Sequence, residues 1–86
     1  MNAKRRKALA AIITRLEELD SLRSEIKDQL EEVRDEEQEA LDNMPESLKE
    51  SERGQQMQEY IDAMESVITE LDYIDLEGAI DQLREI

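Results

Sequence analysis

The sequence contains no cysteine and no histidine. It therefore lacks the usual metal ligands, the thiol nucleophile and the one side chain that titrates near neutral pH in its ordinary state. No disulfide can form, and nothing marks an oxidising compartment. We expect no catalytic residue, no cofactor-binding residue and no metal site, and hence a protein that is not an enzyme. We also expect a cytoplasmic location.

Bulky aromatic residues are almost absent: there is no Phe or Trp, and two Tyr make up the aromatic 2% of the chain. Charged residues reach 41%, a balance that is also found in disordered chains. An ordered domain of 86 residues buries little apolar surface, so self-association is the default expectation. The apolar periodicity described below argues against disorder.

Positive charge is scarce as well. Lys and Arg number 11 against 24 Asp and Glu, which gives a net charge of −13. This charge disfavours direct binding to nucleic acid or anionic membranes, and it favours a protein partner that is basic or that itself binds nucleic acid. No apolar run is long enough to span a bilayer, and the short run that follows the basic residues 4–7 is too short for a signal peptide.

The pattern that is present is a heptad repeat. In the first half of the chain, apolar residues alternate at spacings of three and four, which predicts a helix from about 4 to 43. Arg23 and Glu37 occupy two positions of this seam, either to fix its register or to reach outward to water. The predicted oligomer seam consists of Leu9, Ile12, Leu16, Leu19, Ile26, Leu30, Val33, Ile61, Met64, Ile68 and Leu71.

Pro45 should end the first helix near Met44, because proline disfavours helical geometry in the residue before it. A loop over about 44–51 follows, and either Ser47, in a capping box, or Ser51 can begin the second helix; we favour Ser51. That helix is expected to run over about 52–86, bent but not broken at Gly78.

A connection this short makes the two helices antiparallel neighbours. The predicted fold is all-α, a single antiparallel helical hairpin over residues 1–86 that forms a homodimer, either a four-helix bundle or a coiled-coil-like assembly. The hairpin would place the basic residues 4–7 beside the acidic end of the second helix, with an intramolecular partner as the favoured interpretation and a nucleic-acid backbone or acidic lipid as the alternative.

Carboxylates crowd two helical stretches, 28–42 and 59–81. Carboxylates one helical turn apart lie roughly 6 Å from each other, close to the spacing of phosphates along a nucleic-acid strand, so a rigid acidic hairpin can imitate DNA. A solvated surface without a partner is the alternative. The candidate partner-binding residues are Asp35, Glu36, Glu39, Asp42, Asn43, Glu46, Glu52, Arg53, Asp72 and Asp75.

Residues 36–54, EEQEALDNMPESLKESERG, resemble a segment of small acidic proteins encoded by bacteriophages and prophages, with 42–48 and 51–54 as the most specific parts. The resemblance implies a phage setting in the host cytoplasm but no mechanism. It favours a non-catalytic protein that binds and modulates a host macromolecule. The alternatives are a DNA mimic that inhibits a nucleic-acid-binding defence enzyme, and a structural or assembly coiled coil.

Overall fold

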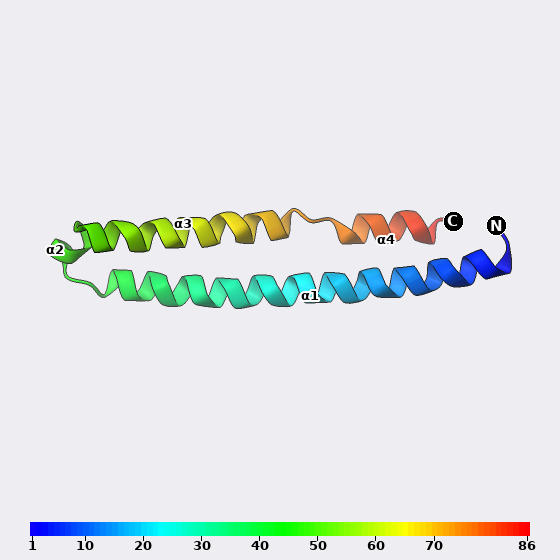
Figure 1. The fold of residues 1–86 in the computed structure, drawn as a ribbon, viewed down its shortest axis with the longest axis horizontal. Helices are drawn as coiled ribbons and strands as arrows, with labels where there is room; N and C mark the ends of the chain where they lie inside the picture. Colours follow the sequence, from blue (N-terminus) through cyan, green and yellow to red (C-terminus); the bar gives the residue numbers. More distant parts are fainter.

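The computed structural model describes all residues from Met1 to Ile86 and contains only helices: α1 (Ala3–Asp42), α2 (Glu46–Lys49), α3 (Glu52–Asp72) and α4 (Leu76–Arg84). The molecule is a rod of 69 × 14 × 13 Å. One arm is α1, and the other consists of α3 and α4, which run back along it in the opposite direction (Figure 1). The all-helical prediction is confirmed, and the arms lie antiparallel, as the short connection requires.

Helix α1 has the bounds that the heptad pattern predicts, to within one residue at each end. The side chain of Asn2 caps its beginning by accepting a hydrogen bond of 2.9 Å from the Arg5 amide. The helix ends at Asp42, and Pro45 follows in extended geometry. A proline at this distance after a helix is common because its ring blocks continuation.

The connection contains the one-turn helix α2, which was expected to be loop. Ser51 is the N-cap residue of α3, as favoured from the sequence, and Ser47 lies inside α2 and begins no long helix. The Ser51 hydroxyl, however, donates to the Leu48 carbonyl and makes no capping bond. Gly54 is buried against the end of α2, where an added Cβ would lie 2.7 Å from the Leu48 oxygen.

The prediction of one continuous helix over 52–86 is wrong. α3 ends at Asp72, Tyr73 to Asp75 leave the helix, and α4 starts afresh at Leu76. The Asp75 carboxylate accepts a hydrogen bond of 2.9 Å from the Gly78 amide, a side-chain cap that begins a new helix at this point. Gly78 therefore lies in the first turn of α4. The helix is interrupted five residues earlier, at Tyr73.

The core between the arms is thin. Leu41, Gly54, Ile61, Ile68 and Ile80 are the only buried residues among the 86. None of the four helices combines the length and the apolar character that crossing a bilayer requires. A hairpin this slender leaves most of its apolar side chains partly in water, and their arrangement decides what the molecule can bind.

Candidate partner-binding surfaces

The side of α1 that faces the other arm is not the whole of the predicted seam. Half-buried or buried residues of α1 recur at 9, 13, 16, 20, 23, 27, 30, 34, 37 and 41, an alternation of four and three, and positions 31 and 38 beside this stripe are half-buried too. Of the predicted seam, Ile61 and Ile68 are buried, and Leu9, Leu16, Leu30, Met64 and Leu71 are half-buried. The remaining four, Ile12, Leu19, Ile26 and Val33, are 44% to 51% exposed. The single seam predicted from the sequence is thus two adjacent stripes, and the opposite arm covers only one of them.

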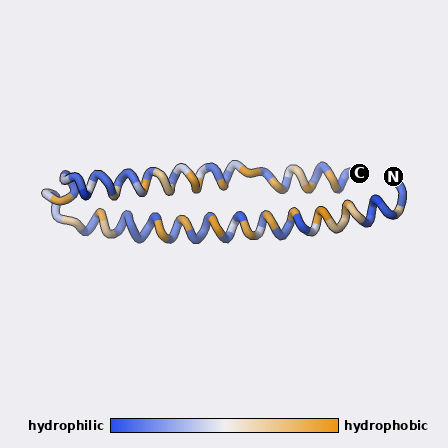
Figure 2. The backbone as a smooth tube through the Cα atoms, viewed as in Figure 1, coloured by the Kyte–Doolittle hydropathy of each residue, from blue (hydrophilic) through white to orange (hydrophobic).

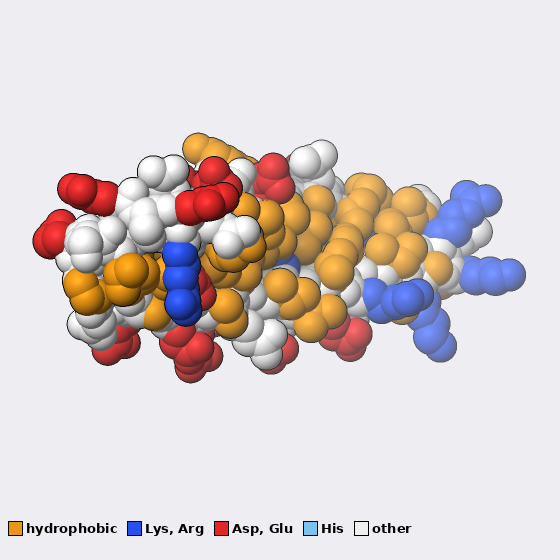
Figure 3. Space-filling view, turned by 60° about the vertical axis from the view of Figure 1, so that its left-hand side comes forward, with side chains coloured by type: hydrophobic (Ala, Val, Ile, Leu, Met, Phe, Trp, Pro, Cys, Tyr) orange, Lys and Arg blue, Asp and Glu red, His pale blue; other side chains and the backbone are white.

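The uncovered stripe belongs to an apolar face that both arms form. Large exposed apolar residues recur at intervals of seven along each arm. Figure 2 shows hydrophobic and hydrophilic residues alternating along both arms. In the space-filling view hydrophobic side chains gather along one long face of the rod (Figure 3). We call this set the apolar face: Ile12, Leu19, Leu22, Ile26, Val33, Tyr60, Val67 and Ile74.

A groove lies at the middle of the apolar face. Four residues of α1 form one wall, and residues around the break between α3 and α4 form the other: Leu19, Leu22, Arg23, Ile26, Leu71, Ile74 and Leu76. The break contributes to the groove, because Ile74 reaches it from the segment between the helices and Leu76 from the start of α4. Leu22, Ile74 and Leu76 were not among the predicted site residues, although the spacing of seven from Tyr60 through Val67 to Ile74 is visible in the sequence.

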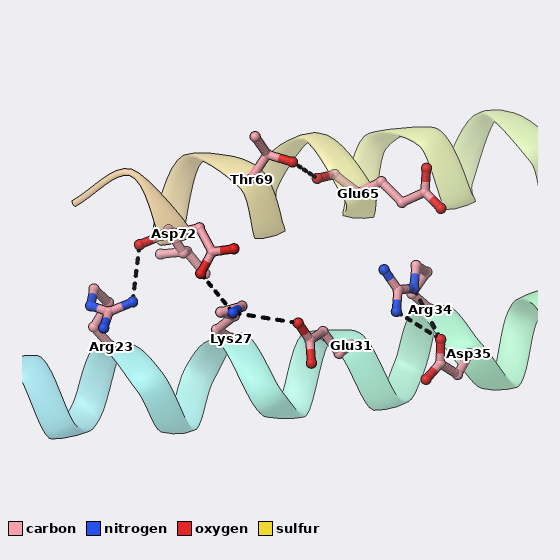
Figure 4. Close-up of polar contacts among 9 residues, drawn as sticks. Arg23, Lys27, Glu31, Arg34, Asp35, Glu65, Thr69 and Asp72 are labelled. Carbon is pink, nitrogen blue, oxygen red and sulfur yellow. Dashed lines mark hydrogen bonds and ion pairs between the residues drawn. The ribbon is translucent and has the colours of Figure 1, made fainter. Parts of the chain in front are cut away.

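Polar side chains interrupt the covered stripe near the break. The Arg23 guanidinium forms an ion pair of 2.9 Å with Asp20 and donates a hydrogen bond of 3.1 Å to the Leu71 carbonyl oxygen of the opposite arm. Figure 4 shows Arg23 and Lys27 projecting from α1 toward the end of α3. Arg23 does not reach outward to water, because its side chain is 19% exposed and bonded to both arms.

Lys27 makes the other charged contact between the arms. Its ammonium lies 2.6 Å from an Asp72 oxygen and 3.7 Å from a Glu31 oxygen (Figure 4). The hydrogen bond to Asp72 is the main reason that the pKa of Lys27 is raised, with further support from the charges of Asp72, Glu31 and Asp28, against a partial loss of solvent. Asp72, a candidate for partner binding, is thus already engaged within the hairpin.

The predicted partner-binding residues divide into two groups. Asp72 and Asp75 lie at the middle of the rod, where Asp72 pairs with Lys27 and Asp75 caps α4, so they do not form a free carboxylate row. The others gather at the loop end, formed by the end of α1, α2 and the start of α3 (Figure 1). We call this group the acidic loop end: Asp35, Glu36, Glu39, Asp42, Asn43, Glu46, Glu52 and Arg53.

Within the acidic loop end, three residues have intramolecular partners: Arg34 lies 2.9 Å from Asp35, Gln38 donates to Asp42 at 3.0 Å, and Lys49 lies 3.5 Å from Glu46. The other members make no side-chain ion pair. Glu36, Glu39 and Glu52 are exposed and carry unpaired carboxylates. This end of the rod can therefore attract a cationic surface.

The basic residues 4–7 do not have the intramolecular partner that the hairpin geometry suggested. All residues from 1 to 8 are exposed, and α1 extends past the end of α4 (Figure 1). Arg84, rather than the basic run, makes the contacts at this end, with Glu17 at 3.0 Å and Asp81 at 3.7 Å. Four cations without an ion pair therefore project from the rod at the end opposite the acidic loop end, as Figure 3 also shows, and Arg6 donates a hydrogen bond of 3.4 Å to the Met1 carbonyl oxygen.

Nowhere do three or more carboxylates converge closely enough to hold a metal ion. Comparisons of this chain with known protein families, with curated proteins and with solved structures gave no match. The geometry of the surfaces is therefore the basis for a functional proposal.

Proposed function

We propose that this chain is a small, acidic, phage-type protein that binds and modulates another macromolecule, in the host cytoplasm and without catalysis, and that it acts as a homodimer. Its apolar face is the dimer interface, most simply that of a four-helix bundle. Its acidic loop end is the surface offered to a partner that is basic or that binds nucleic acid. The phage origin rests on the resemblance of residues 36–54.

The observation that carries this proposal is the uncovered apolar face. An apolar patch that runs along both arms of a rod is larger than the scattered apolar residues of an ordinary protein surface, and such patches mark interaction sites. The single hairpin buries only five residues, so a second layer of helices would supply the core that it lacks. A face of matched apolar stripes is the usual geometry of helical bundles.

A DNA mimic is the second candidate, supported by a row of exposed carboxylates on α1. Glu25, Glu32, Glu36 and Glu39 form no ion pair and follow one another along the helix. This row favours a partner with a basic groove. A purely structural coiled coil remains the third candidate, and large symmetric oligomers that bind no further protein would favour it.

The dimer is tested by analytical ultracentrifugation of the wild type and of the double variant Leu19→Ser, Ile26→Ser. We expect a dimer at micromolar concentration for the wild type, and a dissociation constant raised at least about a hundredfold for the variant, because four large side chains leave each interface. The control variant Leu48→Ser, Tyr73→Ser removes two exposed apolar residues outside the groove and should dimerise normally. A compact wild-type monomer with a cooperative thermal transition would overturn the proposal.

Once a basic partner has been identified, the salt dependence of its affinity distinguishes DNA mimicry from binding through a packed apolar contact. Mimicry predicts an affinity that falls steeply with salt and is lost on adding DNA, because both ligands use the same basic groove. A packed apolar contact predicts little of either effect. Reversal of Glu36 and Glu39 to Lys should weaken the first mode by more than about tenfold and leave the second nearly unchanged.

A further inference from the structure

We infer that the two hairpins of the dimer lie antiparallel, with α1 stacked on α1 of the second copy and the basic residues 4–7 of each copy placed on the acidic loop end of the other. This inference rests on the proposed dimer and adds its orientation. Two independent features, the spacing of the apolar face and the distribution of charge, lead to the same arrangement.

Four apolar residues of α1, those that recur at intervals of seven, read the same in both directions. Ile12, Leu19, Ile26 and Val33 are spaced by seven, and their midpoint falls between positions 22 and 23. Helix α1, from Ala3 to Asp42, has the same midpoint. If α1 is turned end for end about this point, Ile12 comes opposite Val33 and Leu19 opposite Ile26. A two-fold interface requires this reciprocity, since residue i must contact j where j contacts i.

The groove lies at the centre of that symmetry. Its α1 wall consists of Leu19, Leu22, Arg23 and Ile26, which surround the midpoint. In the antiparallel stack the two grooves face each other across the two-fold axis, so that the side chains of one copy fill the groove of the other. The break between α3 and α4 therefore contributes to the dimer interface, because it shapes the groove.

Charge distinguishes the antiparallel dimer from the parallel one. Residues 1–16 contain five of the eleven basic residues and no carboxylate, whereas residues 35–52 are strongly acidic. Turning α1 end for end places residues 4–7 opposite residues 38–41, beside Glu39 and Asp42. A parallel dimer would instead bring the two acidic loop ends together and the two basic ends together, and like charges in contact are unfavourable. The projection of the basic run past α4 leaves it free to reach the second copy.

Spin-label distances test the orientation. Because the sequence has no cysteine, the variants Ala3→Cys and Leu22→Cys each carry one label per chain. In the antiparallel dimer the two labels at position 3 should lie on the order of 60 Å apart, since 39 residues at about 1.5 Å each separate the opposed ends. The labels at position 22 should lie within about 20 Å of each other, across one layer of packed helices.

The outcomes separate this inference from the proposed dimer. A dimer in which the labels at position 3 lie within about 30 Å of each other is parallel, and it would overturn the inference while leaving the dimer intact. The absence of any intermolecular distance, together with a monomer in the ultracentrifuge, would overturn the dimer itself. The antiparallel arrangement is supported when the labels at position 3 are far apart and the labels at position 22 are close together in the same dimer.

A pair of variants with equal net charge tests the ionic contact. Lys4→Gln, Lys7→Gln removes two cations from the basic run, and Ser21→Glu, Ser24→Glu adds two carboxylates to α1 away from the apolar face. We expect the first to raise the dimer dissociation constant about tenfold at low salt, an effect that disappears at about 1 M salt, and the second to change it less than about threefold. Equal effects of the two variants would show that dimerisation depends on net charge alone, and would overturn the inferred contact between the basic residues 4–7 and the acidic loop end.

Discussion

Arg23 and Leu71 are 48 residues apart in the chain, yet the Arg23 guanidinium donates a hydrogen bond of 3.1 Å to the Leu71 carbonyl oxygen. That oxygen lies in the last turn of α3, where carbonyls lack donors from a following helical turn, and it also accepts a bond of 3.4 Å from the Ile74 amide beyond the helix end. A cation at this position also interacts favourably with the negative end of the helix dipole. One charged residue of α1 thus stabilises the point at which the opposite arm leaves the helix.

Replacing Arg23 by Met should lower the free energy of unfolding by about 1–2 kcal/mol, since the hydrogen bond from a charged donor is lost and the Leu71 carbonyl keeps only its longer bond of 3.4 Å from the Ile74 amide. Urea denaturation followed by circular dichroism measures the change. The variant Arg53→Met also removes one positive charge, but Arg53 is exposed and makes no hydrogen bond or ion pair in the structure. Its expected change is below about 0.5 kcal/mol. Equal changes in the two variants would show that the bond to Leu71 contributes nothing.

Much of the hairpin follows from local signals in the sequence. The alternation of apolar residues over forty positions has one simple interpretation, a long helix, and Pro45 is incompatible with its continuation. The position of Ser51 before an apolar period of 3.6 residues gives the start of the second arm. These predictions succeed because each depends on a few neighbouring residues.

The break at residues 73–75 involves one local contact, the Asp75 cap, and one contact between the arms that no local pattern reveals. Leu71, Ile74 and Leu76 fit a helical period about as well as they fit an interrupted one, so the sequence favoured a continuous helix. Two features decide the matter in three dimensions: the Asp75 cap on α4 and the Arg23 bond to Leu71. The apolar face could not be predicted from local patterns either. A heptad pattern does not determine which side of the apolar stripe the neighbouring arm covers.

Gly54 is the position at which local propensity and tertiary packing disagree most. By helix propensity alone, Gly→Ala inside α3 should stabilise the protein by about 1 kcal/mol. An Ala Cβ at this site would lie 2.6 Å from the Lys49 carbonyl carbon and 2.7 Å from the Leu48 oxygen, both backbone atoms that cannot turn away. We therefore expect Gly54→Ala to destabilise the protein by about 1–3 kcal/mol in thermal or urea unfolding, because α2 must move.

Gly78→Ala is the matched control for that variant. Its Cβ would meet the Asp75 carboxylate, the far end of a side chain that can rotate. The gain in helix propensity and the loss of the Asp75 cap should nearly cancel, leaving a change of less than about 1 kcal/mol. A Gly54→Ala protein at least as stable as the wild type would show that α2 can separate from α3 without cost.

The contact between Lys27 and Asp72 gives the hairpin a dependence on alkaline pH. The ammonium lies 2.6 Å from the carboxylate, and Lys27 is 24% exposed at the boundary between the arms. The hydrogen bond from Lys27 to Asp72, with the surrounding carboxylates, raises the pKa of Lys27 above its ordinary value of 10.5. A cation whose pKa is higher in the folded chain than in the unfolded chain binds its proton more tightly when folded, so the protonated form stabilises the fold.

The stabilising effect of Lys27 should therefore be complete below its ordinary pKa of 10.5 and should decline as the pH rises through the higher folded value. We expect Lys27→Met to melt at a lower temperature than the wild type at about pH 8, and the gap to narrow above about pH 11. Comparing the two proteins at each pH cancels the contributions of the other groups, which both proteins contain. Lys49→Met, which removes an ion pair confined to α2, should differ little from the wild type at any pH. A gap for Lys27→Met that stays constant from about pH 8 to 11.5 would mean that Lys27 stabilises the hairpin through its hydrocarbon stem and not through its charge.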